Sequence, residues 1–117
     1  MRKILIVDDD EDTLNILNQL LSKEFDCSLA ENFDEFIKAY EQGLFDLVLS
    51  DLNLGQGKNA TDVCKHVNKK TPVVVMTGGG ESKLQQKVLK NLGCKEVLIK
   101  PFTKDEIVEI FASLADE

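Results

Sequence analysis

The segment Ile4–Asp10 reads Ile-Leu-Ile-Val-Asp-Asp-Asp, so four apolar residues run directly into three acids. An unbroken run of β-branched and leucine side chains lacks the apolar and polar alternation of a sheet with one wet face. It is typical of a parallel strand that is covered on both faces. We therefore predict a strand over residues 3–7 whose carboxyl end carries the acids.

Short apolar runs recur along the chain, and segments with helical periodicity separate them. The strands that we expect cover residues 3–7, 27–30, 46–50, 72–77 and 95–99, with 27–30 as a weaker edge strand. A helix is expected after each strand, because apolar residues there recur three or four positions apart. The stripes predicted to face the core are Leu14/Leu17/Leu21 with Leu20, Phe33/Phe36/Ile37/Tyr40, Ala60/Val63/Cys64/Val67, Leu84/Val88/Leu92 and Ile107/Ile110/Phe111/Leu114.

The ends of two of these helices carry recognisable signals. Thr103 with Glu106 predicts a capping box for the last helix, and Ser82 with Gln85 predicts one for the helix near Glu81–Leu92.

Strict alternation of strands and helices predicts an α/β fold, a three-layer α/β/α sandwich with right-handed crossovers. Five such units in 117 residues match the (βα)5 flavodoxin-like arrangement, a parallel sheet of order 2-1-3-4-5. That order comes from analogy, since alternation alone permits other doubly wound orders. The length predicts one domain, residues 1–117, with no output domain in this chain.

Composition excludes several classes of function. The net charge is −7 and Arg2 is the sole arginine, so we expect no direct contact with nucleic acid, which needs a clustered basic face. Apolar runs reach only four residues, far short of the roughly 20 that span a bilayer, so we expect no membrane segment. His66 is the only histidine, which leaves no partner for a histidine metal site.

The cysteines indicate a reducing environment. Cys27, Cys64 and Cys94 are odd in number and widely separated, a pattern of neither a disulfide framework nor a zinc site. We expect three reduced thiols and a cytoplasmic protein.

Polar residues follow the carboxyl ends of four predicted strands. Asp8 and Asp9 follow the first, Asp51 follows the third, Thr77 ends the fourth and Lys100 follows the fifth. Each residue alone is ordinary, because an aspartate after a strand is usually a helix cap or a turn residue. In the order 2-1-3-4-5, however, ligands bind outside the carboxyl ends of the strands, between the first and third. The fold would bring all five residues into one pocket.

The charges of this pocket require a cation. Two carboxylates about 4 Å apart repel by roughly 4 kcal/mol at an effective dielectric constant near 20. Lys100 offsets only one of the three charges on Asp8, Asp9 and Asp51, so one divalent ion would neutralise the site. Oxygen ligands favour Mg²⁺, with Mn²⁺ as the second choice. Such a site suits a phosphoryl group, and Asp51 could be its nucleophile.

These residues resemble the receiver domains of two-component response regulators, which are CheY-like. The resemblance runs from Lys3 to about Leu114. The stretches that carry it are Ile4–Asp10, Asp46–Leu52, Pro72–Gly78 and Val97–Phe102.

The resemblance implies a role for each acidic residue. Asp51 is expected to be the phosphoacceptor, which takes a phosphoryl group from a phosphohistidine. Asp8 and Asp9 are expected to hold Mg²⁺ together with Asp51, and the backbone carbonyl of Asn53 is expected to be a further ligand.

The resemblance also assigns the remaining polar residues. Thr77 is expected to be the switch hydroxyl that follows the phosphoryl oxygen, and Lys100 the ammonium that pairs with it. Pro101 is expected to follow a cis peptide bond, although only about 5–6% of X-Pro bonds in folded proteins are cis.

Three positions depart from the family pattern. Val97 stands where the family usually carries Tyr or Phe, the loop 54–59 lacks the usual proline, and the run Gly78–Gly80 precedes the fourth helix. We therefore expect phosphorylation to change the conformation of the helix near Glu81–Leu92. Val97 has no ring that could move together with Thr77, whereas the glycines before this helix change their backbone angles easily.

The resemblance implies a signalling switch that is not an enzyme, apart from its own phosphorylation and autodephosphorylation. Its expected partners are a sensor histidine kinase or a histidine phosphotransfer domain, and a downstream protein target or a missing output domain. We expect a monomer.

Two other classes of function remain as alternatives. A phosphohydrolase of the haloacid-dehalogenase type also uses an aspartate nucleophile, but that family has a second aspartate where this chain has Asn53. A pseudo-receiver, an interaction module without phosphorylation, would be favoured by loss of any of the five pocket residues, and all five are present.

Overall fold

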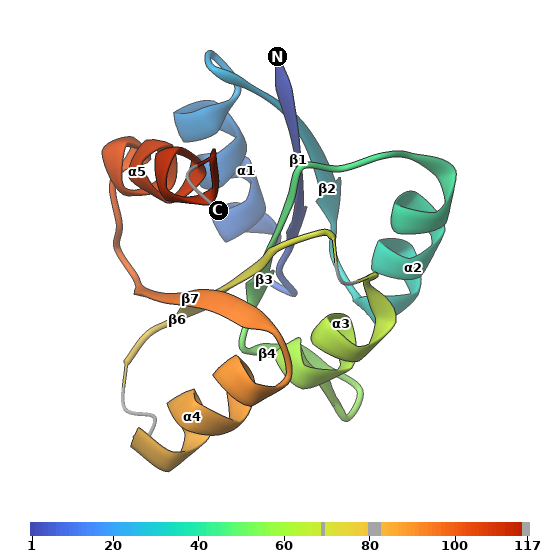
Figure 1. Ribbon diagram of the computed structural model, residues 1–117. Helices are drawn as coiled ribbons and strands as arrows, with labels where there is room; N and C mark the ends of the chain where they lie inside the picture. Colours follow the sequence, from blue (N-terminus) through green and yellow to red (C-terminus); the bar gives the residue numbers. More distant parts are fainter. Residues whose placement is uncertain (69, 80–82, 116–117) are drawn as a thin grey trace.

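The computed structural model describes residues 1–68, 70–79 and 83–115. Its main sheet has five parallel strands in the order β2-β1-β3-β6-β7, with helices on both faces (Figure 1). The strands of this sheet are β1 (Arg2–Val7), β2 (Phe25–Ala30), β3 (Leu47–Asp51), β6 (Val73–Thr77) and β7 (Cys94–Ile99). The expected order 2-1-3-4-5 is confirmed, with β6 and β7 as its fourth and fifth strands.

Five helices alternate with these strands in the described part of the chain. They are α1 (Glu11–Leu21), α2 (Phe33–Gln42), α3 (Ala60–His66), α4 (Lys83–Asn91) and α5 (Lys104–Ala115). The predicted cap of α5 is present in part, because the Glu106 N–H donates to Thr103 Oγ1 at 3.3 Å. The predicted cap at Ser82 lies outside the described residues.

The central strands are apolar throughout because each of their faces is covered. Ile4 and Ile6 join a core with α1 and α5, whereas Leu5 and Val7 join a second core with α2, α3 and α4. Figure 1 shows the same division, with α1 and α5 side by side on one face of the sheet. Since successive strand residues point to opposite faces, two cores require apolar residues at every position.

Most of the predicted helical stripes are confirmed. The buried members of these stripes are Leu14, Leu17, Leu21, Phe36, Ala60, Val63, Cys64, Ile107 and Phe111. The remaining residues of the α2, α3 and α5 stripes are partly buried against the same two cores.

The stripe predicted for α4 is wrong for Leu84 and Val88. Leu84 is 71% exposed and Val88 is 45% exposed, while the buried residue of this helix is Leu89. Leu92 packs against the core as predicted. The helix contacts β7, an outer strand of the sheet, and α3, so only a narrow strip of its surface is covered.

A short hairpin that the sequence did not predict follows β3. It consists of β4 (Asn53–Gly55) and β5 (Lys58–Asn59), which pair antiparallel. Its turn has positive φ angles of 75° at Gly55, 54° at Gln56 and 75° at Gly57, so it needs the glycines that this stretch supplies. Leu54 is buried and fixes the hairpin to the core.

No helix in the described part of the chain is both long and apolar enough to cross a membrane. Cys64 and Cys94 are buried free thiols, and Cys27 is a half-buried one.

The core position of Phe36 generates a stability prediction. Its side chain is fully buried between α2 and the sheet, so Phe36→Ala should lower the free energy of unfolding by about 3–5 kcal/mol. Urea denaturation followed by circular dichroism measures this. The control is Leu44→Ala, because Leu44 is 89% exposed and its loss should change stability by less than about 0.5 kcal/mol. Equal midpoints for the two variants would contradict the assignment of Phe36 to the core.

Candidate functional site

The parallel register brings the predicted site residues to one edge of the sheet. Val7 pairs with Ser50, so Asp8 and Asp51 follow at the ends of neighbouring strands. Asp51 pairs with Met76, the residue before Thr77, and Thr77 pairs with Ile99, the residue before Lys100. Once the order of the strands in the sheet is set, the positions of these residues at the strand ends bring them together.

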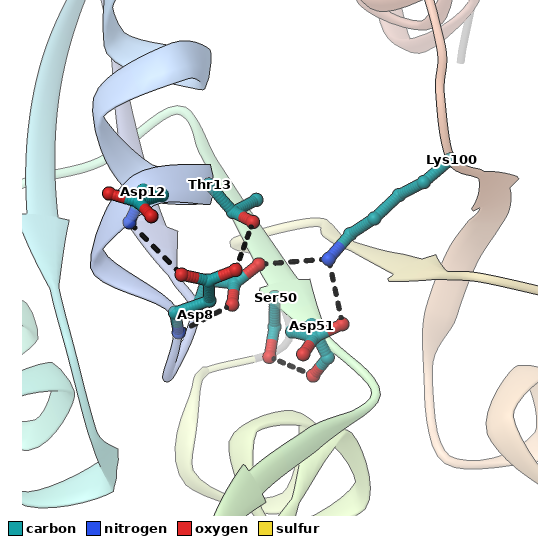
Figure 2. Close-up of polar contacts among 7 residues, drawn as sticks. Asp8, Asp12, Thr13, Ser50, Asp51 and Lys100 are labelled. Carbon is teal, nitrogen blue, oxygen red and sulfur yellow. Dashed lines mark hydrogen bonds and ion pairs between the residues drawn. The ribbon is translucent and has the colours of Figure 1, made fainter.

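Lys100 bridges a buried carboxylate, Asp8, and a half-buried one, Asp51. Its ammonium Nζ donates to Asp8 Oδ2 at 2.9 Å and to Asp51 Oδ1 at 3.2 Å, and Figure 2 shows it reaching between them. Asp8 is 1% exposed, the Asp51 side chain is 18% exposed and that of Lys100 is 28% exposed. The second oxygen of Asp8, Oδ1, accepts the Asp10 N–H at 2.9 Å, which fixes the orientation of the carboxylate.

Burial is the main influence on the pKa of Asp51. It raises the pKa of this carboxyl above its ordinary value, and the neighbouring charge of Asp8 raises it further. The Lys100 ammonium lowers it without cancelling these effects. Asp51 thus carries its negative charge at a free-energy cost in the absence of a further cation.

The pKa of Lys100 is also raised, by a different balance of effects. Burial by itself lowers its pKa, but the hydrogen bond from its ammonium to Asp8 and the charges of Asp51 and Asp8 outweigh burial and raise the pKa. Lys100 is therefore a firmly protonated ammonium beside Asp51.

Three carboxylates can offer oxygen atoms to one ion. Asp8, Asp9 and Asp51 each have a carboxylate oxygen, and these atoms lie within 4.8 Å of one another. With Lys100 as the cation that bridges two of them, this cluster keeps an excess negative charge of two. Oxygen donors in this number and with this charge fit a hard divalent cation such as Mg²⁺.

Thr77 and Lys100 are linked through the backbone as well as by position. Thr77 is 4% exposed, and its hydroxyl Oγ1 accepts the Gly79 N–H at 3.2 Å. The Lys100 N–H donates to the Thr77 carbonyl at 2.7 Å. The Lys100–Pro101 peptide bond is cis, as the resemblance implied.

Val97 packs against the core that contains α2, α3 and α4 and is half-buried. The position that the family usually gives to an aromatic side chain is thus occupied by a small packed residue. No ring is present on β7 to move with Thr77.

The structure adds residues around the site that sequence reasoning missed. A Cβ atom on Gly55 would lie 3.8 Å from Asp9 Oδ2, so the hairpin backbone comes close to the acidic cluster. Asn59 caps α3 in a capping box with Asp62, which anchors the far end of the hairpin. The sequence could have predicted this cap, because Asn59 followed by Asp62 three residues later is a pattern typical of a helix start.

Asp10 acts as a helix cap. Its Oδ1 accepts the Asp12 N–H at 3.0 Å, and its Oδ2 accepts from the Thr13 hydroxyl at 3.0 Å. The third acid of the opening segment thus starts α1, whereas Asp8 and Asp9 belong to the acidic cluster. Asn53 lies in β4, two residues after Asp51, and its carbonyl stays a predicted ligand.

The arrangement provides the components for phosphoryl chemistry. It contains a half-buried carboxylate of the kind that serves as a nucleophile, an ammonium and a hydroxyl at the neighbouring strand ends, and acids that fit a divalent cation.

Comparison with protein families and with known proteins supports this chemistry. The family model described as the response regulator receiver domain matches residues 4–112. The transcription factor SKN7 of Candida albicans is 34% identical over 113 residues, which cover 93% of this chain and 20% of that protein. The sensory transduction protein RegX3 of Mycolicibacterium smegmatis is 32% identical over 110 residues, which cover 92% of this chain and 48% of that protein. The chain therefore spans half or less of the length of these relatives.

Solved structures agree with the fold and its family. A two-component response regulator from Clostridium difficile has a TM-score of 0.87 and 27% identity, with 100% of this chain and 98% of that chain covered. The response regulator TrrA from Thermotoga maritima, solved in complex with Mg(2+)-BeF, has a TM-score of 0.78 and 26% identity. Coverage there is 97% of this chain and 99% of that chain.

The raised pKa of Asp51 generates a prediction about pH. A native state whose carboxyl pKa is raised binds the proton more readily than the unfolded chain, so ionised Asp51 destabilises the metal-free protein above that pKa. Metal-free Asp51→Asn should therefore melt at a higher temperature than wild type at pH 7. The difference should shrink as the pH falls through the raised pKa of Asp51 in the native protein. It should vanish below the ordinary aspartate pKa of about 3.9, where the carboxyl is protonated in the native and the unfolded chain alike.

Thermal denaturation in the presence of a chelator measures this difference. The control is Asp26→Asn, which makes the same change of charge at an exposed position on β2. A lower melting temperature for Asp51→Asn at pH 7, with Asp26→Asn unchanged, would contradict the electrostatic account of the site.

Proposed function

The chain belongs to the response regulator receiver domain family, and on that premise we propose that it is a signalling switch whose phosphoacceptor is Asp51. The observation that carries the proposal is the position of Lys100, whose ammonium joins Asp51 to Asp8 at 3.2 and 2.9 Å. This places a fixed positive charge beside the nucleophile, where a phosphoryl oxygen would need it.

The proposed reaction transfers a phosphoryl group from a phosphohistidine to Asp51. A carboxylate oxygen of Asp51 attacks phosphorus, a P–O bond forms, and the P–N bond breaks with its electron pair passing to the imidazole nitrogen. Lys100 then pairs with a phosphoryl oxygen while it keeps its bond to Asp8. The donor is a sensor histidine kinase or a histidine phosphotransfer domain.

The acidic cluster fits Mg²⁺, with Mn²⁺ as an alternative. Asp8, Asp9 and Asp51 would hold the ion through their carboxylates, and the backbone carbonyl of Asn53 would add a ligand. Mg²⁺, when bound, neutralises the charge that the carboxylates and the phosphoryl oxygens bring together. That TrrA, a structural relative, was solved with Mg(2+)-BeF supports this choice.

The conformational response is proposed to start at Thr77. Its hydroxyl accepts the Gly79 N–H, so a phosphoryl oxygen that draws the hydroxyl inward would break or reorient this bond. Gly79 has φ of +96°, a conformation that glycine adopts readily, and can change its backbone angles without a steric penalty. The element next along the chain is α4, which we propose as the face that changes.

The chemistry of the switch is limited to its own phosphorylation and the loss of its own phosphoryl group. We therefore propose that the chain is not an enzyme acting on other substrates. The receiver works as a monomer in the cytoplasm, and its output passes to a downstream protein or to an output domain beyond this sequence.

Phosphorylation at Asp51 is directly testable. Incubation with acetyl phosphate and Mg²⁺ should add one phosphoryl group to the wild-type chain and none to Asp51→Asn, because the amide is not a nucleophile at this site. Intact mass spectrometry measures the addition. Asp26→Asn serves as the control and should be labelled like wild type. Equal labelling of Asp51→Asn and wild type would overturn the assignment. Rapid turnover of a generic phosphate ester, which is typical of a hydrolase, would also overturn it.

Metal binding should appear as a change in stability. Mg²⁺ that binds only the native state raises the melting temperature, and the increase should be mostly lost in Asp9→Asn, which removes one of three carboxylates. Differential scanning fluorimetry across a Mg²⁺ titration measures it, again with Asp26→Asn as the control. The same thermal shift in wild type and Asp9→Asn would argue against an ion at this cluster.

The proposed response of α4 has its own test. Beryllofluoride with Mg²⁺ mimics the phosphoryl group, and it should perturb amide signals of residues 77–92 more than those of β7 or α5. Chemical shifts of the isotopically labelled chain measure this, and Asp51→Asn should show no such change. If the largest changes away from the site fall around Val97 and α5, the glycine-dependent response is wrong.

A further inference from the structure

Helix α4 exposes apolar side chains that its sequence pattern would place in the core. Leu84 is 71% exposed and Val88 is 45% exposed, one helical turn apart on the same surface of the helix. Leu89, by contrast, is 2% exposed. Scattered exposed apolar residues are ordinary, but this pair adjoins a groove.

The groove lies between α4, α3 and the start of the β4–β5 hairpin and has a volume of about 300 Å³. Three apolar residues of α4, together with Leu52, give it an apolar lining, and Asn53 and Thr61 add polar groups. The apolar residues of α4 are Leu84, Val88 and Leu89. An apolar cleft with a few polar groups is the usual form of a binding site.

The α4 wall of this groove carries a charge opposite to that of the whole chain. The segment from Lys83 to Lys95 contains four lysines and no acid, although the net charge of the chain is −7. Three of these lysines recur along α4 and are exposed: Lys83, Lys87 and Lys90. Lys87 is three positions from Leu84, so a positive charge and an apolar side chain are neighbours on the helix surface.

We propose that this groove docks a peptide segment of a downstream protein that carries acidic residues beside a bulky apolar anchor. The anchor would cover Leu84 and Val88, and the acids would pair with Lys83 and Lys87. An uncharged apolar segment would form no ion pairs with these lysines, and a basic segment would be repelled by them. Charge complementarity therefore selects the partner, while the apolar lining supplies the buried contact.

The link between this docking site and signalling rests on the proposed function. Leu52 and Asn53, which line the groove, directly follow Asp51 in the chain, and α4 follows Thr77 and Gly79. A change at Asp51 or Thr77 thus reaches the groove from two sides, through the hairpin and through the start of α4. Beryllofluoride should change the affinity of the docked peptide.

The test selects short random peptides, displayed on phage, against the full unphosphorylated chain. Enriched peptides are synthesised with a fluorescent label, and their affinities are measured by fluorescence polarisation at low and high salt. We expect them to be acidic with an aromatic or aliphatic anchor, and to shift the amide signals of α4, Leu52 and Thr61. Leu84→Glu should weaken binding by about tenfold or more, since it removes an apolar contact and adds a repelled charge.

Matched variants separate this groove from a general apolar or charge effect. Ile16→Glu places the same charge at a residue of α1 that is 64% exposed, and Lys38→Glu reverses an exposed lysine of α2. Both should leave affinity within about twofold of wild type, whereas Lys87→Glu should weaken binding and reduce its dependence on salt. Circular dichroism verifies that each variant is folded.

Several outcomes would overturn the proposal. They are selected peptides that are not acidic, amide shifts centred on β7 and α5, equal effects of Leu84→Glu and Ile16→Glu, and self-association of the chain that Leu84→Glu abolishes. If acetyl phosphate labels Asp51, an affinity that beryllofluoride leaves unchanged also overturns the proposal. Phosphorylation is measured separately with acetyl phosphate. If Asp51 is labelled but no acidic peptide maps to the groove, the docking inference alone fails. If peptides map there but Asp51 is not labelled, the proposed function alone fails.

Discussion

The carboxylates of Asp8, Asp9 and Asp51 lie close together at the carboxyl ends of the strands, and their mutual repulsion is the constraint on which the rest of the site depends. Asp8 and Asp51 end neighbouring strands, and Lys100 places one ammonium between them at 2.9 and 3.2 Å. Burial raises the pKa of Asp51, and the neighbouring charge of Asp8 raises it further although Lys100 lies between the two carboxylates. A divalent cation would relieve this repulsion, and it would also offset the negative charge that a phosphoryl group adds.

Apolar packing on both faces of the sheet offsets the cost of placing these carboxylates close together. Alternate residues of β1, β3 and β6 enter two separate cores, and the helices on each face bury them completely. The carboxyl ends of the strands are thus fixed by apolar contacts on both sides. The polar residues beyond those ends are positioned by the backbone of buried strands, while the hairpin after β3 brings Gly55 close to Asp9.

Helix α4 is the exception to this uniform packing. It contacts the outer strand β7 and its neighbour α3, and it buries Leu89 while Leu84 and Val88 stay exposed. A helix with a narrow buried strip has less apolar contact to lose when it moves than a helix such as α1 or α5. The same narrow packing exposes the apolar and basic surface on which the docking inference rests. The proposed response of α4 and the proposed docking site therefore depend on the same narrow packing.

The local sequence pattern by itself determined the alternation of strands and helices. A strand that is covered on both faces has an unbroken apolar run, whereas a helix that buries one face has apolar residues three or four positions apart. It also placed Asp8, Asp9, Asp51, Thr77 and Lys100 at strand ends, and the family resemblance supplied the strand order that makes them converge. Sequence could not determine which apolar residues of α4 are buried, since Leu84, Val88, Leu89 and Leu92 all fit helical spacing and only contact with β7 and α3 selects among them. Nor could it foresee the β4–β5 hairpin, whose strands are too short to have a periodic pattern and which is held by Leu54 in the core and by the cap at Asn59. Periodicity is a property of neighbours in the chain, whereas these features depend on neighbours in space.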